Sequence, residues 1–393
     1  MPASTRTVVS PFQAGFGVSP PVLAGREPEQ SVLNTALHRL CETQSGGCVI
    51  LSGPRGNGKT ALLKWLVNRA KAQKVGHLWL TPDDVASQRD LARLVNPSRI
   101  KQGLSAIGLA GRHESVEGSM RIEFEPDSHA APVFEALHRR VKNRPCVLIV
   151  DEAHALDSLV GQALLNSTQK CLVREAPLLL VLAGTPDIQH ALDSMNSSFW
   201  SRSRILGIGL IENEAVLEAI ERPLADQGIA LQDDAVRSEV IAEAQGYPYF
   251  AQLLGDALWE SARRDQDAQA PSGSNHILGS ADATYAFAVM SRHRQEFYET
   301  RLAELYDRAL FDSARAVLDC FADQSSIHRE QVDHVLEKTR GSAEQGAEAL
   351  VQLQRLGFIW SPPGSNLRFE PGIPSFFSFL REYGYSSAPA TAS

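Results

Sequence analysis

The sequence predicts an α/β protein with a parallel sheet, followed by a helical segment and a small C-terminal domain. Between Val22 and Leu206, short uninterrupted apolar runs alternate with segments of helical periodicity. Such runs are typical of parallel strands whose two faces are both covered by helices. Beyond residue 300, three short amphipathic segments precede two apolar runs separated by a turn. This second pattern predicts three helices and a hairpin.

In the first part of the chain, strands and helices are expected to alternate as in βαβ units. The expected strands are 48–51, 77–80, 145–150, 178–183 and a further short run at 205–211. The expected helices are 28–43, 60–73, 82–94, 131–142 and 157–173. The stretch 97–126 is rich in Gly and Ser and interrupts this alternation, so we expect an inserted loop or hairpin there.

The remainder of the chain is predicted to be helical, apart from a hairpin near the C-terminus. Helices are expected at 212–227, 234–245, 248–264, 280–305, 314–322, 328–338, 342–356 and 376–383, with a polar linker at 265–280. Runs at 358–360 and 367–370 flank the turn sequence Ser-Pro-Pro-Gly-Ser-Asn. Three short helices followed by a hairpin is the layout of a winged helix.

These patterns divide the chain into six expected segments. They are a flexible N-terminal segment (1–20), a nucleotide-binding α/β core (21–206), a helical lid (207–264), a linker with a connecting helix (265–300), a winged-helix-like domain (301–385) and a tail (386–393). The functional names in this division depend on the motifs described next.

Composition limits the classes of function. A net charge of −8 over 393 residues argues against binding of polyanions by bulk charge. The five cysteines form no C-x-x-C pair, which favours buried thiols in a reducing compartment over disulfides or a zinc site. No apolar run approaches the length of a membrane span, and the N-terminal residues lack a hydrophobic signal core. We therefore expect a cytoplasmic protein with no membrane partner.

The strongest motif is a phosphate-binding loop. Residues 53–60 read Gly-Pro-Arg-Gly-Asn-Gly-Lys-Thr and fit G-x-x-x-x-G-K-[ST] at each fixed position. An apolar strand precedes the loop and a helix follows, so backbone N–H groups and the helix N-terminus both favour an anion. Lys59 is expected to reach the β- and γ-phosphates, and the Thr60 hydroxyl to ligate Mg²⁺. The expected nucleotide contacts in the loop are Gly53, Pro54, Arg55, Gly56, Asn57, Gly58, Lys59 and Thr60.

Two carboxylates follow the strand expected at 145–150. Asp151 is expected to hold Mg²⁺ through water or Thr60, and Glu152 to polarise the water that attacks the γ-phosphate. His154 completes the letters Asp-Glu-Ala-His, which also occur in a class of helicases. Because no second motor domain follows, we interpret His154 as a surface histidine or as one that supports the site.

A third strand also ends in polar residues. Thr185 follows the run 178–183 and is expected to hydrogen-bond the γ-phosphate. The alternative is that Thr185 caps the helix after Pro186.

Taken together, these motifs resemble those of AAA+ ATPases. The segments Gly25-Arg26-Glu27, the phosphate loop, Asp151-Glu152, Ala183–Pro186, Ser201–Arg204 and Gly246–Phe250 occur in the order seen in that family, over residues 20–265. They look most like the branch shared by archaeal-type ATPases, origin-recognition ATPases and STAND signalling NTPases.

The resemblance implies further roles. The segment Val22–Arg26, with Leu23 and Arg26, would line the adenine pocket, and Gly246 and Pro248 would position the lid. Arg202 or Arg204 would act as an arginine finger on the nucleotide of a neighbouring subunit, in a homo-oligomer. From the residues alone, Arg26 could instead pair with Glu27 or Glu29, and Arg202 and Arg204 could form surface ion pairs.

The chain departs from many AAA+ proteins at the start of the lid helix. Where an arginine often touches the γ-phosphate, this chain has Tyr247-Pro248-Tyr249, so no second sensor arginine is assigned. This favours a nucleotide-controlled switch with slow or partner-stimulated turnover over a continuously cycling motor. The aromatic residues Tyr247, Tyr249 and Phe250 are interpreted as lid core.

The C-terminal domain leaves the partner open. From Arg301 onward, the sequence contains nine Lys and Arg residues and twelve Asp and Glu residues. The third expected helix carries Glu344 and Glu348. A surface that binds duplex DNA normally needs a basic footprint. The main hypothesis is therefore an ATP-hydrolysing switch that engages a protein partner. The alternatives are an ATP-dependent DNA-binding loader or regulator and a STAND-like signalling or defence adaptor.

Overall fold

The computed structural model describes residues 9–12, 15, 19–95, 131–142, 144–196, 199–269, 276–321, 324–365 and 367–383. The chain divides into two compact units. Residues 30–52 and 65–206 form the first, called here the sheet unit. Residues 1–29, 53–64 and 207–393 form the second, called the loop-and-lid unit.

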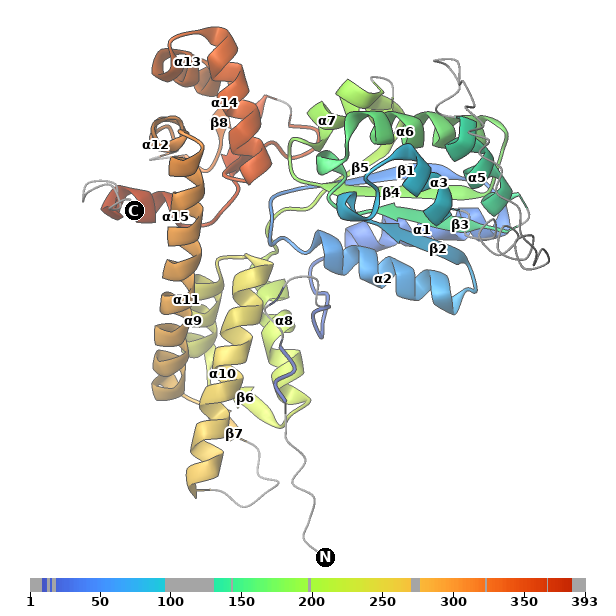
Figure 1. The fold of residues 1–393 in the computed structure, drawn as a ribbon. Coiled ribbons are helices and arrows are strands. Elements are labelled where there is room, and N and C mark those ends of the chain that lie inside the picture. Colours follow the sequence, from blue (N-terminus) through green and yellow to red (C-terminus); the bar gives the residue numbers. More distant parts are fainter. Residues whose placement is uncertain are drawn as a thin grey trace, which may run out of the picture. The chain divides into compact units, whose positions relative to one another are not determined.

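A five-stranded sheet with the order β2-β3-β4-β1-β5 forms the centre of the sheet unit (Figure 1). Strands β1 to β4 run parallel to their neighbours in the sheet. The strands are β1 (Gly47–Ser52), β2 (Gly76–Leu80), β3 (Cys146–Val150), β4 (Leu178–Gly184) and β5 (Arg204–Gly207). The helices are α1 (Glu27–Glu42), α2 (Lys59–Ala72), α3 (Gln88–Val95), α5 (Ala131–Val141), α6 (Ser158–Val173) and α7 (Ile188–Met195).

Both faces of the central strands are buried, as the uninterrupted apolar runs predict. On one face, Ile50, Leu148 and Leu180 belong to a core that also holds residues of α3, α5, α6 and α7. On the other face, Val147 and Val181 have no exposed surface, and α1 and α2 lie along this side (Figure 1). Successive residues of a strand alternate between faces, so a strand covered on both sides must be apolar throughout.

Two predictions for the sheet unit differ from the structure. The run 205–211 is a strand only over Arg204–Gly207, because the next two carbonyls, of Ile208 and Gly209, accept side-chain hydrogen bonds. The helix expected at 82–94 is a 3₁₀ turn, Pro82–Asp84, and then α3. The break follows from local caps, since Asp84 accepts from the Thr81 backbone and Ser87 accepts from the Asp90 backbone. The insertion predicted at 97–126 lies outside the described residues.

The loop-and-lid unit is mostly helical. Its first elements are α8 (Asn213–Ala225), β6 (Ile229–Leu231), α9 (Asp234–Ala244), α10 (Pro248–Gln269), β7 (His276–Leu278) and α11 (Ser280–Asp307). Then follow α12 (Phe311–Asp319), β8 (Ile327–His328), α13 (Arg329–Arg340), α14 (Ala343–Leu356), β9 (Ile359–Trp360), β10 (Arg368–Pro371) and α15 (Phe376–Tyr383). The predicted helices are present with small shifts of their ends, and β9 and β10 form the predicted antiparallel pair.

Three strands of this unit were not predicted. Strand β6 pairs with β7 in parallel, and β8 joins β10 to complete a three-stranded sheet. Each of these strands has two or three residues, which is too short for a periodic pattern to show in the sequence.

An aromatic cluster fills the core of the loop-and-lid unit. Tyr247 and Phe250 are fully buried and meet edge to face, with ring centroids 4.8 Å apart. Phe297 and Tyr298 of α11 extend the cluster toward Phe376 of α15. The interpretation of these lid aromatics as core residues is thus confirmed.

The cysteines match the expectation of unpaired thiols. All five are free, and Cys146 and Cys171 are buried. Burial raises the pKa of the Cys171 thiol to about 11, so this side chain stays protonated and unreactive at neutral pH. Among the described helices, none combines the length and the apolar character that a membrane span requires.

Candidate nucleotide-binding site

The phosphate loop has the backbone that its glycines predict. The loop starts directly after Ser52, the last residue of β1, and α2 begins at Lys59. Gly56 and Gly58 have φ values of 80° and 88°, in the left-handed region that strongly favours glycine. A turn of this kind directs successive N–H groups into one concavity at a helix N-terminus, where an anion binds favourably.

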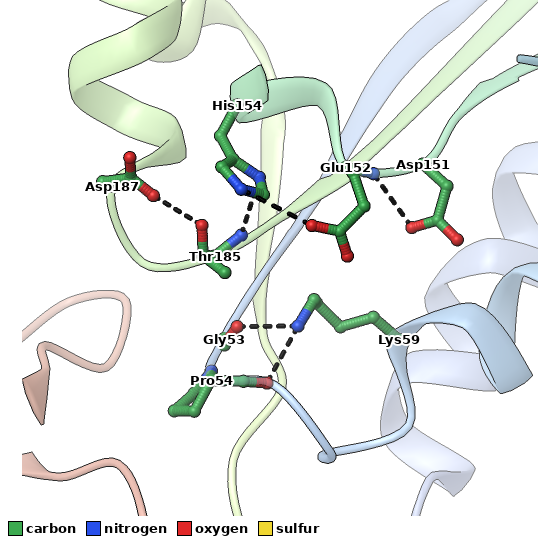
Figure 2. Close-up of polar contacts among 8 residues, drawn as sticks. All are labelled: Gly53, Pro54, Lys59, Asp151, Glu152, His154, Thr185 and Asp187. Atoms are coloured by element: carbon green, nitrogen blue, oxygen red, sulfur yellow. Dashed lines mark hydrogen bonds and ion pairs between the residues drawn. The ribbon is translucent and has the colours of Figure 1, made fainter. Parts of the chain in front are cut away.

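Lys59 lies within the loop. Its side chain is buried, and the Nζ atom donates hydrogen bonds to the carbonyl oxygens of Gly53 and Pro54, each at 2.8 Å (Figure 2). These two contacts hold the ammonium group at the loop, where its charge favours a phosphate group. Thr60, the next residue, is half-buried at the start of α2.

Arg26 forms a hydrogen bond that supports the phosphate loop. Its guanidinium group is buried and donates to the carbonyl oxygens of Asn57, at 3.0 Å, and of Gly209. The Asn57 side chain donates in turn to the carbonyl oxygen of Ile208 at 3.1 Å. Two segments that are distant in sequence, at Arg26 and at 208–209, are thereby joined to the phosphate loop.

Arg26 also forms an ion pair with Glu29, at 3.5 Å. Burial lowers the pKa of Arg26, while Glu29 acts in the opposite direction. The pairing with Glu29 that we considered from the sequence is therefore present. The loop contacts give Arg26 a structural role that sequence reasoning did not assign.

The acidic residues lie in the sheet unit, directly after β3. Asp151 is buried and accepts a hydrogen bond from the Glu152 backbone at 3.1 Å. Glu152 has a φ of 53°, which is unusual for a residue with a side chain, and its carboxylate is 44 % exposed. This left-handed residue lies between β3 and the 3₁₀ turn Ala153–Ala155.

His154 connects the acidic residues to Thr185 (Figure 2). Its Nδ1 atom accepts from the Thr185 backbone N–H at 3.3 Å, and its Nε2 atom lies 3.5 Å from a Glu152 carboxylate oxygen. Because Nδ1 accepts, the proton of the neutral ring is on Nε2, which faces Glu152. His154 is buried, so the surface alternative is wrong and the supporting one agrees with the geometry.

Thr185 is fully buried after β4. Its hydroxyl donates to the Asp187 carboxylate at 2.5 Å, and its carbonyl accepts from Ile188 at the start of α7. The side chain therefore does not cap α7, which was the alternative role. Asp187 orients the hydroxyl, a role that was not predicted from the sequence.

The register of the sheet explains why the phosphate loop, the acidic residues and Thr185 directly follow β1, β3 and β4. In the parallel register, Ser52 pairs with Gly184, and Val150 pairs with Leu182. The carboxyl ends of the three strands thus lie at one edge of the sheet, where open α/β proteins bind ligands.

The other predicted residues are placed as follows. Leu23 is half-buried in the segment before α1, and Pro248 is the first residue of α10. Arg202 ends the 3₁₀ turn Trp200–Arg202, and Arg204 begins β5. Both arginines are exposed, and neither forms an ion pair with another described residue.

A family model for the AAA ATPase domain matches residues 22–181. The chain contains an AAA+ ATPase domain. The matched residues include the phosphate loop, Asp151 and Glu152. The α/β fold with a parallel sheet and the nucleotide-binding role of this AAA+ domain agree with the sequence analysis.

Three matches among solved structures cover more than 90% of this chain, each with a TM-score below 0.5. The Thermotoga maritima RuvB Holliday junction branch migration motor is 16% identical with a TM-score of 0.47, covering 91% of this chain and 95% of its own. Cdc6p from Pyrobaculum aerophilum is 14% identical with a TM-score of 0.45, covering 94% and 95%. The Aeropyrum pernix ORC1 protein in complex with DNA is 16% identical with a TM-score of 0.44, covering 93% and 94%. No curated protein matches the sequence.

Proposed function

We propose that this AAA+ protein binds ATP with Mg²⁺ and hydrolyses it slowly, as a switch that engages a protein partner. The observation that carries the proposal is the phosphate loop. It combines two left-handed glycines with a buried Lys59 at the N-terminus of α2. Backbone N–H groups of the loop would bind the phosphates, and Lys59 would neutralise charge on the β- and γ-phosphates. Leu23 and the neighbouring residues of the segment before α1 would contact the base.

The donor set fits a hard cation. The Thr60 hydroxyl and the Asp151 carboxylate supply oxygen atoms, which are the ligands that Mg²⁺ prefers. When bound, Mg²⁺ would neutralise charge that develops on the phosphate oxygens.

Glu152 is proposed as the general base. Its exposed carboxylate would accept the proton of the attacking water. The Nε2–H of His154 would orient that carboxylate. Thr185 is proposed to sense the γ-phosphate by a hydrogen bond of its hydroxyl, which Asp187 orients.

Arg202 and Arg204 are proposed to act in an oligomer. An exposed guanidinium group without an ion pair among the described residues is available to a neighbouring copy. There it could stabilise charge on the transferring phosphoryl group. Turnover would then require assembly.

Steady-state hydrolysis tests the switch directly. We expect phosphate release from ATP that stops when EDTA removes Mg²⁺ and rises more than linearly with protein concentration. Loss of hydrolysis with EDTA follows from the oxygen donors that would hold Mg²⁺. The dependence on protein concentration follows from an arginine finger supplied by another copy. Absence of ATP binding by calorimetry would contradict the proposal, and strictly linear rates would contradict the oligomeric finger.

A second candidate function is ATP-dependent binding of duplex DNA. It is favoured by the order α12-β8-α13-α14-β9-β10, with its three-stranded sheet, which is the order of a winged helix. It is opposed by the excess of acidic residues after Arg301, including Glu344 and Glu348 of α14.

Binding of ATP-loaded Glu152→Gln protein to duplex DNA, measured over a salt series, separates the two functions. A DNA-binding protein would lose affinity steeply with salt, because neutralised phosphates release their counterions. For the favoured switch we expect no binding at low salt, which would leave the C-terminal domain as a protein-docking module. Strong ATP-dependent binding with a steep salt slope would instead establish the DNA function.

A further inference from the structure

Tyr247 makes a direct contact with the phosphate loop that the proposed mechanism does not use. Its hydroxyl donates a hydrogen bond of 2.7 Å to the carbonyl oxygen of Arg55, the third residue of the loop. Both residues belong to the loop-and-lid unit. Tyr247 directly precedes α10, at the position where the sequence analysis found no sensor arginine.

The turn between α9 and α10 fixes where the tyrosine lies. Gln245 and Gly246 have φ values of 54° and 67°, so the chain reverses sharply after α9. The Gly246 carbonyl accepts from the Ile211 backbone, and Pro248 starts α10 at a position that proline favours. The Tyr247 backbone is therefore held on both sides.

The ring is held as firmly as its backbone. Tyr247 is 1 % exposed, and it packs edge to face on Phe250 and near Tyr249 and Phe297. Burial raises the pKa of the phenol well above its ordinary value, so the group stays protonated and can donate at physiological pH.

Gly56 shows how close the contact is. A Cβ atom built on Gly56 would lie 2.2 Å from the Tyr247 oxygen and 2.5 Å from the ring carbon that carries it. The phenol thus occupies the space that a side chain at position 56 would need. Gly56 itself remains exposed, so its backbone is open on the side away from Tyr247.

The hydrogen bond orients a peptide group of the loop. In a planar trans peptide, the C=O and N–H bonds point in opposite directions. A hydroxyl that fixes the Arg55 carbonyl therefore also fixes the N–H of Gly56, on the opposite side of the same peptide. In an anion-binding loop, N–H groups directed at the ligand before it arrives avoid the cost of reorganisation.

We propose that Tyr247 is a positioning residue for phosphate binding. Its hydroxyl holds the Arg55–Gly56 peptide so that the Gly56 N–H faces the bound phosphates. This inference rests on the proposed binding of ATP at the loop.

Binding measurements on Tyr247→Phe test the inference, with Tyr249→Phe as the matched control. The probes are ATP, ADP and tripolyphosphate, each titrated by calorimetry. Removal of the hydroxyl keeps the ring and the aromatic cluster, so we expect Tyr247→Phe to bind all three probes about tenfold more weakly, by the same factor. Tyr249→Phe, two residues away in the same cluster, is expected to stay within about twofold of the wild type.

The tripolyphosphate titration distinguishes positioning from a general structural role. Tripolyphosphate has no base or ribose, so its affinity depends on the phosphate contacts alone. Unchanged tripolyphosphate affinity in Tyr247→Phe would overturn the inference, whatever the change for ATP. A wild-type protein that binds none of the three probes would overturn the proposed function together with the inference. Normal wild-type binding with an unaffected variant would overturn the inference alone.

Discussion

Replacement of Lys59 by alanine is expected to weaken ATP binding by at least about 100-fold, which corresponds to about 3 kcal/mol. The structure holds the ammonium group within the phosphate loop, through the carbonyls of Gly53 and Pro54. Its loss removes charge-assisted hydrogen bonds to phosphate, which are stronger than neutral ones. Equilibrium titration with a fluorescent ATP analogue measures the change.

Lys71→Ala is the matched control for this variant. Lys71 lies in the last turn of the same helix, α2, and is exposed, so its replacement should leave ATP affinity within about twofold. Comparison of the melting temperatures separates loss of the ligand contact from loss of the fold. Retention of wild-type affinity by Lys59→Ala would show that the nucleotide does not bind at this loop.

Glu152→Gln is expected to bind ATP within about threefold of the wild type but to hydrolyse it about 10²–10⁴-fold more slowly, the usual contribution of a general base. Glutamine has the same shape and can still accept a hydrogen bond from His154, but it cannot take the proton of the attacking water. Single-turnover phosphate release after rapid mixing measures the chemical step without product release.

Glu175 offers a matched control for the charge and for the backbone. It is an exposed glutamate, and its φ of 55° is close to the 53° of Glu152. Glu175→Gln removes the same charge from the same backbone conformation at a distant turn and should leave hydrolysis unchanged. A Glu152→Gln variant that hydrolyses ATP at the wild-type rate would remove Glu152 from the role of base.

Features that depend on neighbouring residues could be predicted from the sequence. The phosphate loop consists of eight consecutive residues, and strands β1, β3 and β4 contain uninterrupted apolar runs, since central parallel strands are buried on both faces. Asp151, Glu152 and Thr185 could be located because each follows such a run. The family resemblance named Arg26 for the adenine pocket, and that role stays a prediction; the structure shows its guanidinium group at the Asn57 carbonyl of the loop.

Features that depend on distant residues could not be predicted in this way. The Arg26 contact with Gly209 and the Tyr247 contact with Arg55 join positions 183 and 192 residues apart. Neither pairing leaves a periodic or local signal. The burial of His154 was missed for a similar reason, because its partner Thr185 is 31 residues away.

The long-range support of the phosphate loop has a consequence for synthesis of the chain. The loop motif is complete once residue 60 has been made, but its partners Ile208, Gly209 and Tyr247 are added roughly 150 to 190 residues later. Translation at about 5–20 residues per second separates these events by roughly 7 to 40 seconds. During that interval, a nascent chain carries the motif without the contacts that shape it. We therefore expect competence to bind nucleotide to arise late, when the turn before α10 has left the ribosome.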